Sequence, residues 1–487
     1  MNPLKKLLSQ TAVYGLSSIF GRMLNFMLVP LYTRYFSTVE YGEVTILYAY
    51  VAFLIVILTY GMETAFFRFS ELESNKNKVF STGLISLSVS AVLFVFVCWV
   101  FSQDIASAIG FGNRPQYIQY FALIVGLDAV TSISFAKLRQ QNKALRFATI
   151  RLLNIFVNIG LNLFFIVYCD YAIENQLDSA SLVEKIYNPN FGIGYIFIAN
   201  LVASALSFLL LLPQMLGHFN NFDKELWKKM LVYGSPLLIA GLAGIANETL
   251  DRIILQYLLP SDVAISQIGI YSALYKLSII MTLFIQAFRF AAEPFFFAQA
   301  KQKDAKQLYA VVLKYFTIVT STIFLACMLY FDTIKNFIGP EFQDPSAKLV
   351  VALLLFANLF LGIYYNLSIW YKLSQQTKYG AYMSIFGAFL TVGLNLLLVP
   401  YMGFEGAAWT TLICYFSMVV LSYFLCQKHY PIPYPIFKIS FYLILSLGLY
   451  LFSLYFDMGM LLNTVYILIF ISVSLFLEKQ KTPIFKF

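Results

Sequence analysis

The stretch AKLVVALLLFANLFLGIYYNLSIW, residues 347–370, carries one charged side chain, Lys348, near its start. An α-helix rises about 1.5 Å per residue, so about twenty such residues cross the hydrocarbon core of a bilayer, which is roughly 30 Å thick. Comparable apolar stretches recur along the chain from Ser9 to Leu477. The sequence therefore predicts an all-α integral membrane protein.

The composition agrees with this class. Of the 487 residues, 60% are hydrophobic and 12% are charged, whereas soluble proteins contain about 25% charged residues. The net charge of +9 could suggest nucleic acid, but the basic residues lie in short loops between apolar segments, so no nucleic-acid partner is expected. Five cysteines are scattered singly without a CxxC spacing, which predicts neither a disulfide framework nor a metal site.

Apolar stretches and their flanking loops predict about fourteen transmembrane helices. We expect them at residues 9–31, 44–67, 80–101, 117–136, 147–168, 191–212, 232–257, 268–290, 309–330, 347–370, 379–400, 405–426, 437–455 and 460–477.

The loops alternate strongly in charge. With the N-terminus on the cytoplasmic side, that side receives most of the Lys and Arg residues, whereas the other side receives Arg34, Arg114, Lys185, Lys335 and Lys348. This asymmetry follows the positive-inside rule, and one missed or extra helix would destroy it. The pattern predicts that both termini face the cytoplasm.

The chain also repeats itself weakly. The segment Asn158-Ile-Gly-Leu-Asn162 matches Thr391-Val-Gly-Leu-Asn395 six predicted helices later, and Tyr14-Gly15 matches Tyr233-Gly234. Internal repeats are typical of transporters built from two halves. We predict a six-helix half in residues 1–225, a second in residues 226–430, and two further helices in residues 431–487. Since both halves begin on the same side, a central cavity between them is expected.

Several motifs resemble a known family. Tyr233-Gly-Ser-Pro236, Asp251-Arg252, the stretch from Gly269 to Lys276, and Glu293-Pro294 resemble the opening of the second half in polysaccharide and O-antigen flippases. The first half, from Gly21-Arg22 through Tyr41-Gly42, is similar to the same family's opening pattern. These flippases belong to the multidrug/oligosaccharidyl-lipid/polysaccharide (MOP) exporter superfamily, which implies a MATE-like fold.

The resemblance implies a transporter and not an enzyme. The expected activity is translocation of a polyprenyl-diphosphate-linked oligosaccharide across a cell inner membrane for polysaccharide or lipopolysaccharide biosynthesis. A lipid II flippase and a MATE-type multidrug exporter are the alternatives. The partners so implied are the lipid-linked anionic oligosaccharide, membrane lipid, and a polysaccharide polymerase or glycosyltransferases of the same pathway. The chain contains no Walker motif, and no cofactor or metal is predicted.

Ionisable side chains in the middle of membrane helices are costly, at about 2.5 to 3.5 kcal/mol each, and therefore mark candidate sites. Arg22 and Asn25 share one helix face, where they could line a cavity or bind a neighbouring helix. Lys276 has no acidic residue at helical spacing, so its partner must be another helix, water or a ligand. We predict that Arg22, Asn25, Lys276 and Arg252 bind the anionic substrate.

Acidic residues supply the candidates for coupling or gating. Asp128 is a lone intramembrane carboxylate, which could bind a coupling ion. Glu248 stands four residues before Arg252, the spacing of an intrahelical ion pair, and Asp251 adjoins it. Arg289 and Glu293 have the same spacing near the cytoplasmic end of their helix and are expected to form a structural or gating pair.

The histidines and one row of asparagines are two further polar features of the sequence. The chain has only two histidines, His218 and His429, and both fall in predicted cytoplasmic loops. Asn154, Asn158 and Asn162 form a stripe at spacing four. Such amides most often bind neighbouring helices, at about 0.6 kcal/mol each, so saccharide binding is the less favoured interpretation.

Overall fold

The computed structural model describes residues 15, 19–300, 302–455 and 460–479, and these are organised as helices without strands. Contacts divide the chain into two compact units, Met1–Ile253 and Ile254–Phe487. The division falls inside one long helix, α12 (Lys224–Leu258). Much of α12 therefore packs with the first unit. The boundary at residue 225, which rests on the sequence repeat, stays a prediction.

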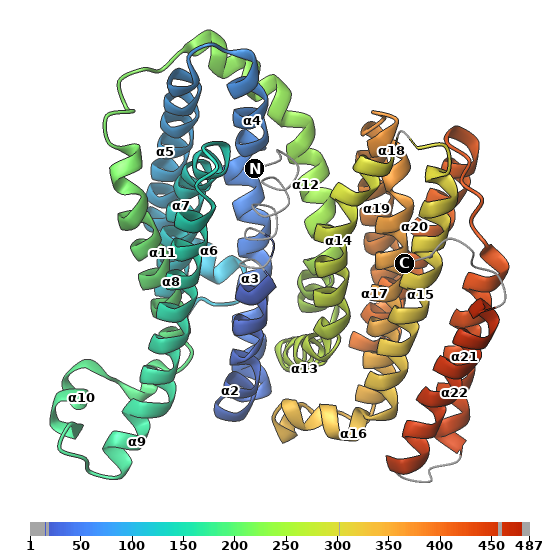
Figure 1. Ribbon diagram of the computed structural model, residues 1–487. Helices are drawn as coiled ribbons and strands as arrows, with labels where there is room; N and C mark the ends of the chain where they lie inside the picture. The colour runs from blue at the N-terminus through green and yellow to red at the C-terminus, as the bar shows by residue number, and fades with distance from the viewer. Residues whose placement is uncertain (1–14, 16–18, 301, 456–459, 480–487) are drawn as a thin grey trace. The chain divides into compact units, whose positions relative to one another are not determined.

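In the first unit, residues 19–26 are helical and are followed by twelve elements that precede α12. The third, fourth, fifth and sixth predicted helices correspond to α5, α7, α8 and α11, and α5 packs on α7 while α7 and α8 pack on α11 (Figure 1). The elements are α2 (Leu28–Tyr35), α3 (Thr38–Thr59), α4 (Met62–Leu72), α5 (Lys76–Val100), α6 (Ser102–Ala108), α7 (Pro115–Gln140), α8 (Ala144–Leu163), the π-helix η1 (Phe164–Tyr168), α9 (Cys169–Glu174), α10 (Ala180–Ile186), the 3₁₀-helix η2 (Pro189–Phe191) and α11 (Gly194–Met215).

In the second unit, α17 and α19 pack on α20, and α15 packs on α21 and α22. The elements are α13 (Ala264–Leu277), α14 (Ile279–Gln299), α15 (Ala305–Leu329), α16 (Phe331–Ile334), η3 (Lys335–Phe337), η4 (Pro340–Phe342), α17 (Ala347–Leu367), α18 (Ile369–Leu373), α19 (Lys378–Met402), α20 (Phe404–His429), α21 (Ile436–Tyr455) and α22 (Met460–Lys479).

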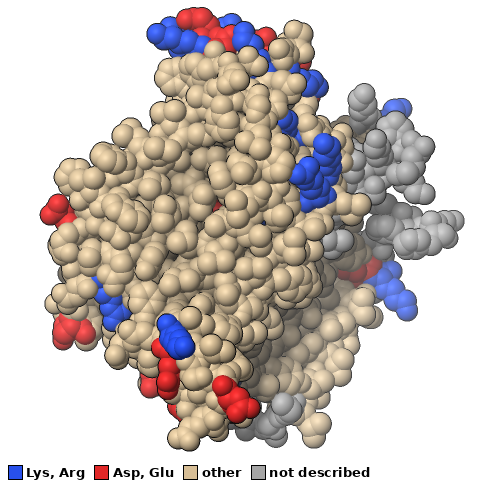
Figure 2. Space-filling view, turned by 90° about the vertical axis from the view of Figure 1, so that its left-hand side faces the viewer, with Lys and Arg blue, Asp and Glu red and all other residues tan. Residues whose placement is uncertain are grey.

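Among the described residues, 13 segments are long and apolar enough to cross a membrane. Each corresponds to one of the predicted helices after the first, which lies partly outside the described residues. The expectation of about fourteen helices and of an all-α membrane protein is confirmed. Side chains facing away from the bundle fit lipid as solvent, since Val92 and Phe96 of α5 are 69% and 63% exposed. Figure 2 shows charged side chains of the first unit toward its ends and rim, around a broad uncharged centre.

The fourth span of each predicted half is its most enclosed helix. In both α7 and the α17–α18 span, 78% of the central 18-residue window is buried, compared with 22% for α5. A helix with apolar residues on every side belongs in the centre of a bundle. The six-helix spacing between these two central helices matches the sequence repeat.

The two C-terminal helices are fastened to α15 by a buried charge cluster. Glu478 of α22 is 5% exposed and accepts hydrogen bonds from Lys314 of α15, and from Lys438 and Tyr442 of α21, the last two at 2.7 Å and 2.9 Å. These contacts could not be predicted from the sequence pattern, because the residues lie on three different helices.

Replacing Glu478 by Gln is expected to lower the thermal unfolding midpoint in detergent, because Lys314 would keep a buried charge without its carboxylate. Removing one partner of a buried ion pair costs about 3–5 kcal/mol. Glu225→Gln is the matched control, since it removes the exposed pair of Glu225 with Lys228, and exposed pairs contribute little. Equal midpoints for the two variants would contradict the proposed fastening role.

Candidate functional site

The second predicted helix of each half is interrupted, at Tyr60-Gly61 inside the span Thr38–Leu72 and at Ser278 just before the span Ile279–Gln299. In the first unit α3 ends at Thr59, and α4 begins at Met62 after Tyr60 and Gly61, whose φ angles are 33° and 71°. In the second unit α13 ends at Leu277, and α14 begins after Ser278. The predicted helices 44–67 and 268–290 ran through both breaks and were wrong on this point. Interrupted helices at corresponding positions of two halves point to the binding site of a transporter.

The first break is held against α12 by glycine. A Cβ on Gly61 would lie 2.7 Å from the carbonyl oxygen of Gly234, and a Cβ on Gly234 would lie 2.7 Å from that of Tyr60. Ser86 of α5 also contacts the Tyr60 hydroxyl at 2.7 Å and accepts a hydrogen bond from the Trp227 indole of α12 at 2.7 Å. Only glycine permits this backbone approach, which explains the Tyr233-Gly234 motif.

The second break places a cation at the C-terminus of a helix. Lys276 is half-buried in the last turn of α13, where the helix dipole favours a positive charge. The Ser278 hydroxyl donates to the carbonyl of Tyr275 at 2.7 Å and accepts from the Asn358 amide of α17 at 3.2 Å. Lys276 therefore stands at the end of a half-helix, which is where transporters commonly bind ions and substrates.

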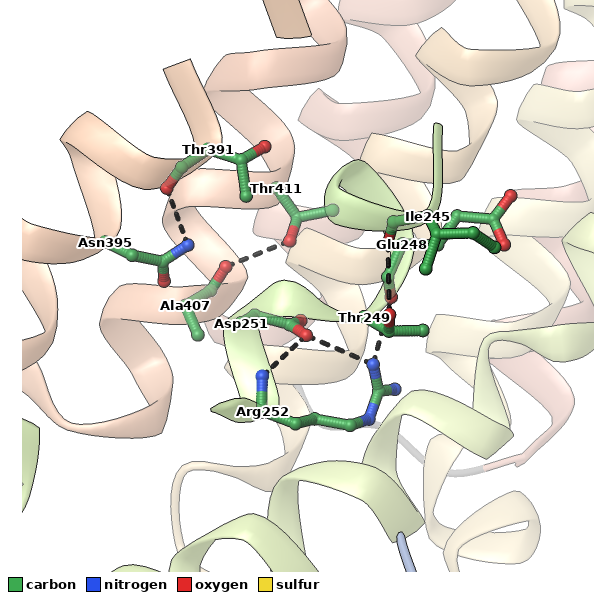
Figure 3. A network of polar contacts seen from close by, with 9 residues as sticks. All are labelled: Ile245, Glu248, Thr249, Asp251, Arg252, Thr391, Asn395, Ala407 and Thr411. Carbon is green, nitrogen blue, oxygen red and sulfur yellow. Dashed lines mark hydrogen bonds and ion pairs between the residues drawn. The ribbon is translucent and has the colours of Figure 1, made fainter. Parts of the chain in front are cut away.

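Arg252 and Asp251 form a buried pair on α12, and they are 8% and 5% exposed. The Arg252 guanidinium lies 3.1 Å from the Asp251 carboxylate and donates to the carbonyl oxygen of Glu248 at 2.9 Å. Figure 3 shows the Glu248 carboxylate turned away from this guanidinium. The carboxylate beside Arg252 is thus that of Asp251, not that of Glu248 as the spacing suggested. Tyr41 of α3 lies within electrostatic range of Arg252.

The repeated motif makes the same local bond in both units. Asn162 donates to the carbonyl of Asn158 at 2.8 Å. Asn395 donates to that of Thr391 at 2.8 Å, as Figure 3 shows. Both asparagines are fully buried. Asn162 also accepts a hydrogen bond from the Tyr32 hydroxyl at 2.9 Å. These amides bind neighbouring groups of the protein, as the packing interpretation expected.

Arg22 and Asn25 lie on the exposed side of the helical segment 19–26. Gly21, next to Arg22, faces α8 so closely that a Cβ would lie 2.6 Å from Ile155. Neither Arg22 nor Asn25 makes a hydrogen bond or ion pair within the described part of the chain. An exposed arginine without an acidic partner within an apolar helix needs water or an anionic ligand.

Asp128 is not the lone carboxylate that the sequence suggested. It is half-buried on α7, shares a hydrogen bond with Ser204 of α11, and lies in the field of Arg151 of α8. The Arg151 guanidinium lies 4.1 Å from the ring centre of Phe135. Tyr48 of α3 is near enough to interact with Asp128 electrostatically. A carboxylate with an adjacent arginine, hydroxyl and phenol can gain or lose a proton without a fully uncompensated charge.

Arg289 and Glu293 form the expected pair on α14, with 3.9 Å between charged atoms. The structure adds two partners that the spacing missed, because Glu293 is also bound by Lys372 of α18, and Arg289 stacks at 3.9 Å on Tyr365. The first unit has a similar link, in which Glu63 of α4 is bound by Arg139 near the end of α7. In each unit an acid on the second span is tied to the end of the fourth.

The fold and these features define a multi-pass membrane protein with the architecture of MOP-superfamily transporters. The structure resembles lipid II flippase MurJ in an inward closed conformation, with a TM-score of 0.73 and 16% identity over 95% of this chain and 98% of that chain. An inward-facing MATE family multidrug resistance transporter of the MOP superfamily matches with a TM-score of 0.61 and 12% identity over 86% of this chain and 94% of that chain. These likenesses show the fold.

Residues 7–299 match the polysaccharide biosynthesis protein family. The chain belongs to this family, and the resemblance inferred from its motifs is confirmed. Lsg locus putative protein 1 of Haemophilus influenzae is 20% identical over 344 residues, which are 69% of this chain and 78% of that protein.

Gly234→Ala is expected to destabilise the protein by about 1–3 kcal/mol, because the new methyl group would overlap the Tyr60 carbonyl and push the broken helix from α12. Thermal unfolding in detergent measures the effect. Gly244→Ala on the same helix is the control, since no atom lies within 4 Å of its Cβ position, and alanine is the better helix former. A midpoint for Gly234→Ala equal to that of Gly244→Ala would disprove the close contact.

Proposed function

We propose that this protein moves a polyprenyl-diphosphate-linked oligosaccharide from the cytoplasmic to the outer face of the cell inner membrane, by alternating access, for polysaccharide or lipopolysaccharide synthesis. The membership in the polysaccharide biosynthesis protein family carries the proposal. The fold shared with a lipid II flippase supports it. Both termini are proposed to face the cytoplasm, and a polymerase or glycosyltransferases of the same pathway would supply or receive the substrate.

The chemistry of such a substrate fits the cations found within the spans. Its polyprenyl chain is soluble in the bilayer, whereas the diphosphate and the glycan must be shielded from it. Arginine binds phosphate with two parallel hydrogen bonds, and lysine provides a compact charge that binds phosphate as a point charge. We assign the diphosphate to Arg22 and Lys276, with Asn25 and Arg252 supporting it. Arg22 is the best supported of these because it is exposed and makes no ion pair or hydrogen bond with another described residue.

A lipid II flippase is the second candidate, because the MurJ structure covers nearly the whole chain. Its substrate presents the same diphosphate chemistry, so a direct comparison of the two lipids decides between them. A multidrug exporter is less well supported, since a cavity for cationic drugs would need an excess of carboxylates, whereas Arg22 and Lys276 are basic.

Energy for the cycle could come from the membrane potential or from an ion gradient. A potential of 100 mV, negative inside, is worth about 2.3 kcal/mol for each negative charge moved outward. We propose Asp128 as the coupling group, because it is a carboxylate within a span with a neighbouring hydroxyl and arginine. Glu248, Asp251, Arg289 and Glu293 are proposed to gate the cycle, the last two through Lys372.

Arg22→Ala and Lys276→Ala are each expected to slow transfer of a fluorescent polyprenyl-diphosphate oligosaccharide into the outer leaflet of proteoliposomes by about 10- to 100-fold. This corresponds to the roughly 1.5–3 kcal/mol of a charge-assisted hydrogen bond. Lys228→Ala, which removes an exposed lysine of α12, is the control at equal insertion. Unchanged transfer in both variants would contradict the assignment of the diphosphate to these residues. Transfer of lipid II alone would favour the second candidate.

Asp128→Asn is expected to abolish acceleration by an imposed pH gradient while leaving acceleration by an imposed potential, because the amide cannot exchange a proton. Transfer rates under each gradient measure this. Glu174→Gln on the exposed outer helix α9 is the control. If Asp128→Asn slowed both rates equally, its role would be structural, as the partner of Arg151.

A further inference from the structure

Both histidines of the chain lie at, or just beyond, the end of the sixth helix of a half. His218 follows α11, which ends at Met215, and His429 is the last residue of α20. Each packs against the end of the fourth span of its own unit, His218 on Lys137 of α7 and His429 on Trp370 of α18. Because their partners differ, protonation is expected to disrupt the contacts of His218 and to preserve those of His429.

His218 is fixed on three sides. Its Nε2 lies 3.0 Å from the Lys137 ammonium, its Nδ1 lies 3.3 Å from the Ser81 hydroxyl, and its ring meets Phe80 edge-on at 5.1 Å. Lys137 is 6% exposed and also lies 3.8 Å from the Phe80 ring centre. An ammonium can only donate, so Nε2 must accept and the imidazole must be neutral, with its proton on Nδ1.

The charged groups around His218 offer no compensation for a second positive charge. Lys137 faces it from α7, and Lys143 in the turn after α7 adds to the positive field on Lys137. Asp223, in the same connector, is bound by Lys78 of α5 at 2.5 Å, which lowers the pKa of Asp223 to about 2. Burial, followed by the charge of Lys137, lowers the pKa of His218 below its ordinary value.

The contacts of His429, in comparison, do not require its ring to be neutral. Its Nε2 lies 3.0 Å from the Tyr379 hydroxyl, which can either donate or accept. Its ring stacks on the Trp370 indole with an interplanar angle of 8°, and an indole face attracts a cation. Protonation of His429 would therefore keep its contacts, whereas protonation of His218 would remove an acceptor and set two cations 3.0 Å apart.

We propose that His218 is a proton-operated latch, which holds the connector of residues 216–223 on the ends of α5 and α7 when neutral and releases it when protonated. The connector joins α11 to α12, and it is also held by a hydrogen bond from the Asp223 amide to the Thr82 hydroxyl at 3.2 Å. Release frees the first turn of α12, the helix that continues into the second unit. In the proposed orientation, the latch senses the pH of the cytoplasm.

The direction of the pH effect follows from proton binding. The released state has an ordinary histidine pKa of about 6.5, whereas the latched state has a lower one. The released state thus binds more protons, so the contribution of neutral His218 to the latch is complete above about pH 6.5 and is lost as the pH falls through that value toward the pKa of the latched state. Each pH unit in this window favours release by up to about tenfold.

The test is the labelling rate of Thr82→Cys, in a background in which the five native cysteines are replaced by serine. Thr82 is fully buried beneath the connector. Ser74→Cys, at an exposed position before α5, provides the reference rate at each pH, which removes the intrinsic pH dependence of the thiol. The purified full-length protein is labelled in nanodiscs with a water-soluble iodoacetamide between pH 5 and pH 8.

The normalised rate is expected to be low at pH 8 and to rise at least tenfold by pH 5. His218→Gln should stay low throughout, because glutamine can accept from Lys137 and donate to Ser81 without titrating. His218→Arg should be high already at pH 8, and Lys137→Met should lose the rise. His429→Gln is the matched control and should follow the parent.

A flat profile in the parent would overturn the latch, and so would a persistent rise in His218→Gln or the loss of the rise in His429→Gln. If His218→Arg does not fold, the Gln and Met variants decide the outcome alone. The labelling reports the connector and not the transported molecule, so the result does not depend on the proposed flippase activity.

Discussion

A bilayer offers no water to backbone N–H and C=O groups, so a helical chain that spans it must satisfy them within its helices or through neighbouring groups of the protein. The described residues follow this constraint, and the deviations are informative. Where the second spans break, at Tyr60-Gly61 and at Ser278, side chains of the protein surround the exposed backbone: Ser278 donates to the carbonyl of Tyr275, and Gly234 packs directly on the turn at Gly61.

The same cost governs charged side chains. Glu478 has two lysines and a tyrosine, Asp128 has Ser204 and Arg151, and Glu293 has Lys372. Each partner lies on a helix other than the one that carries the acid, so these charges also fix how the helices pack. Arg22 differs, since it is exposed on its helix and has no such partner among the described residues. An exposed charge of this kind is available to a ligand, which is why the proposed diphosphate site is centred there.

The internal repeat shows which features the fold needs and which are free to diverge. Asn162 and Asn395 make the same bond, and α7 and α17 occupy the same enclosed position. The histidines after the sixth helices, in contrast, kept their place and changed their partners, one a lysine and the other a tryptophan. Equivalent ends of the two halves thus carry different chemistry.

The sequence by itself determined the membrane class, the number and order of spans, and the family, because these depend on apolar length, loop charge and local motifs. It also located Arg22, Lys276 and Asp251-Arg252 as charges within spans. The tertiary structure decided the breaks inside the second spans and the partners of each charge. A glycine turn at Gly61 is hidden within an apolar run, and pairs such as Lys314 with Glu478 join residues 164 positions apart. Hydropathy and helical spacing describe one helix at a time, whereas ion pairs between helices depend on how the bundle folds.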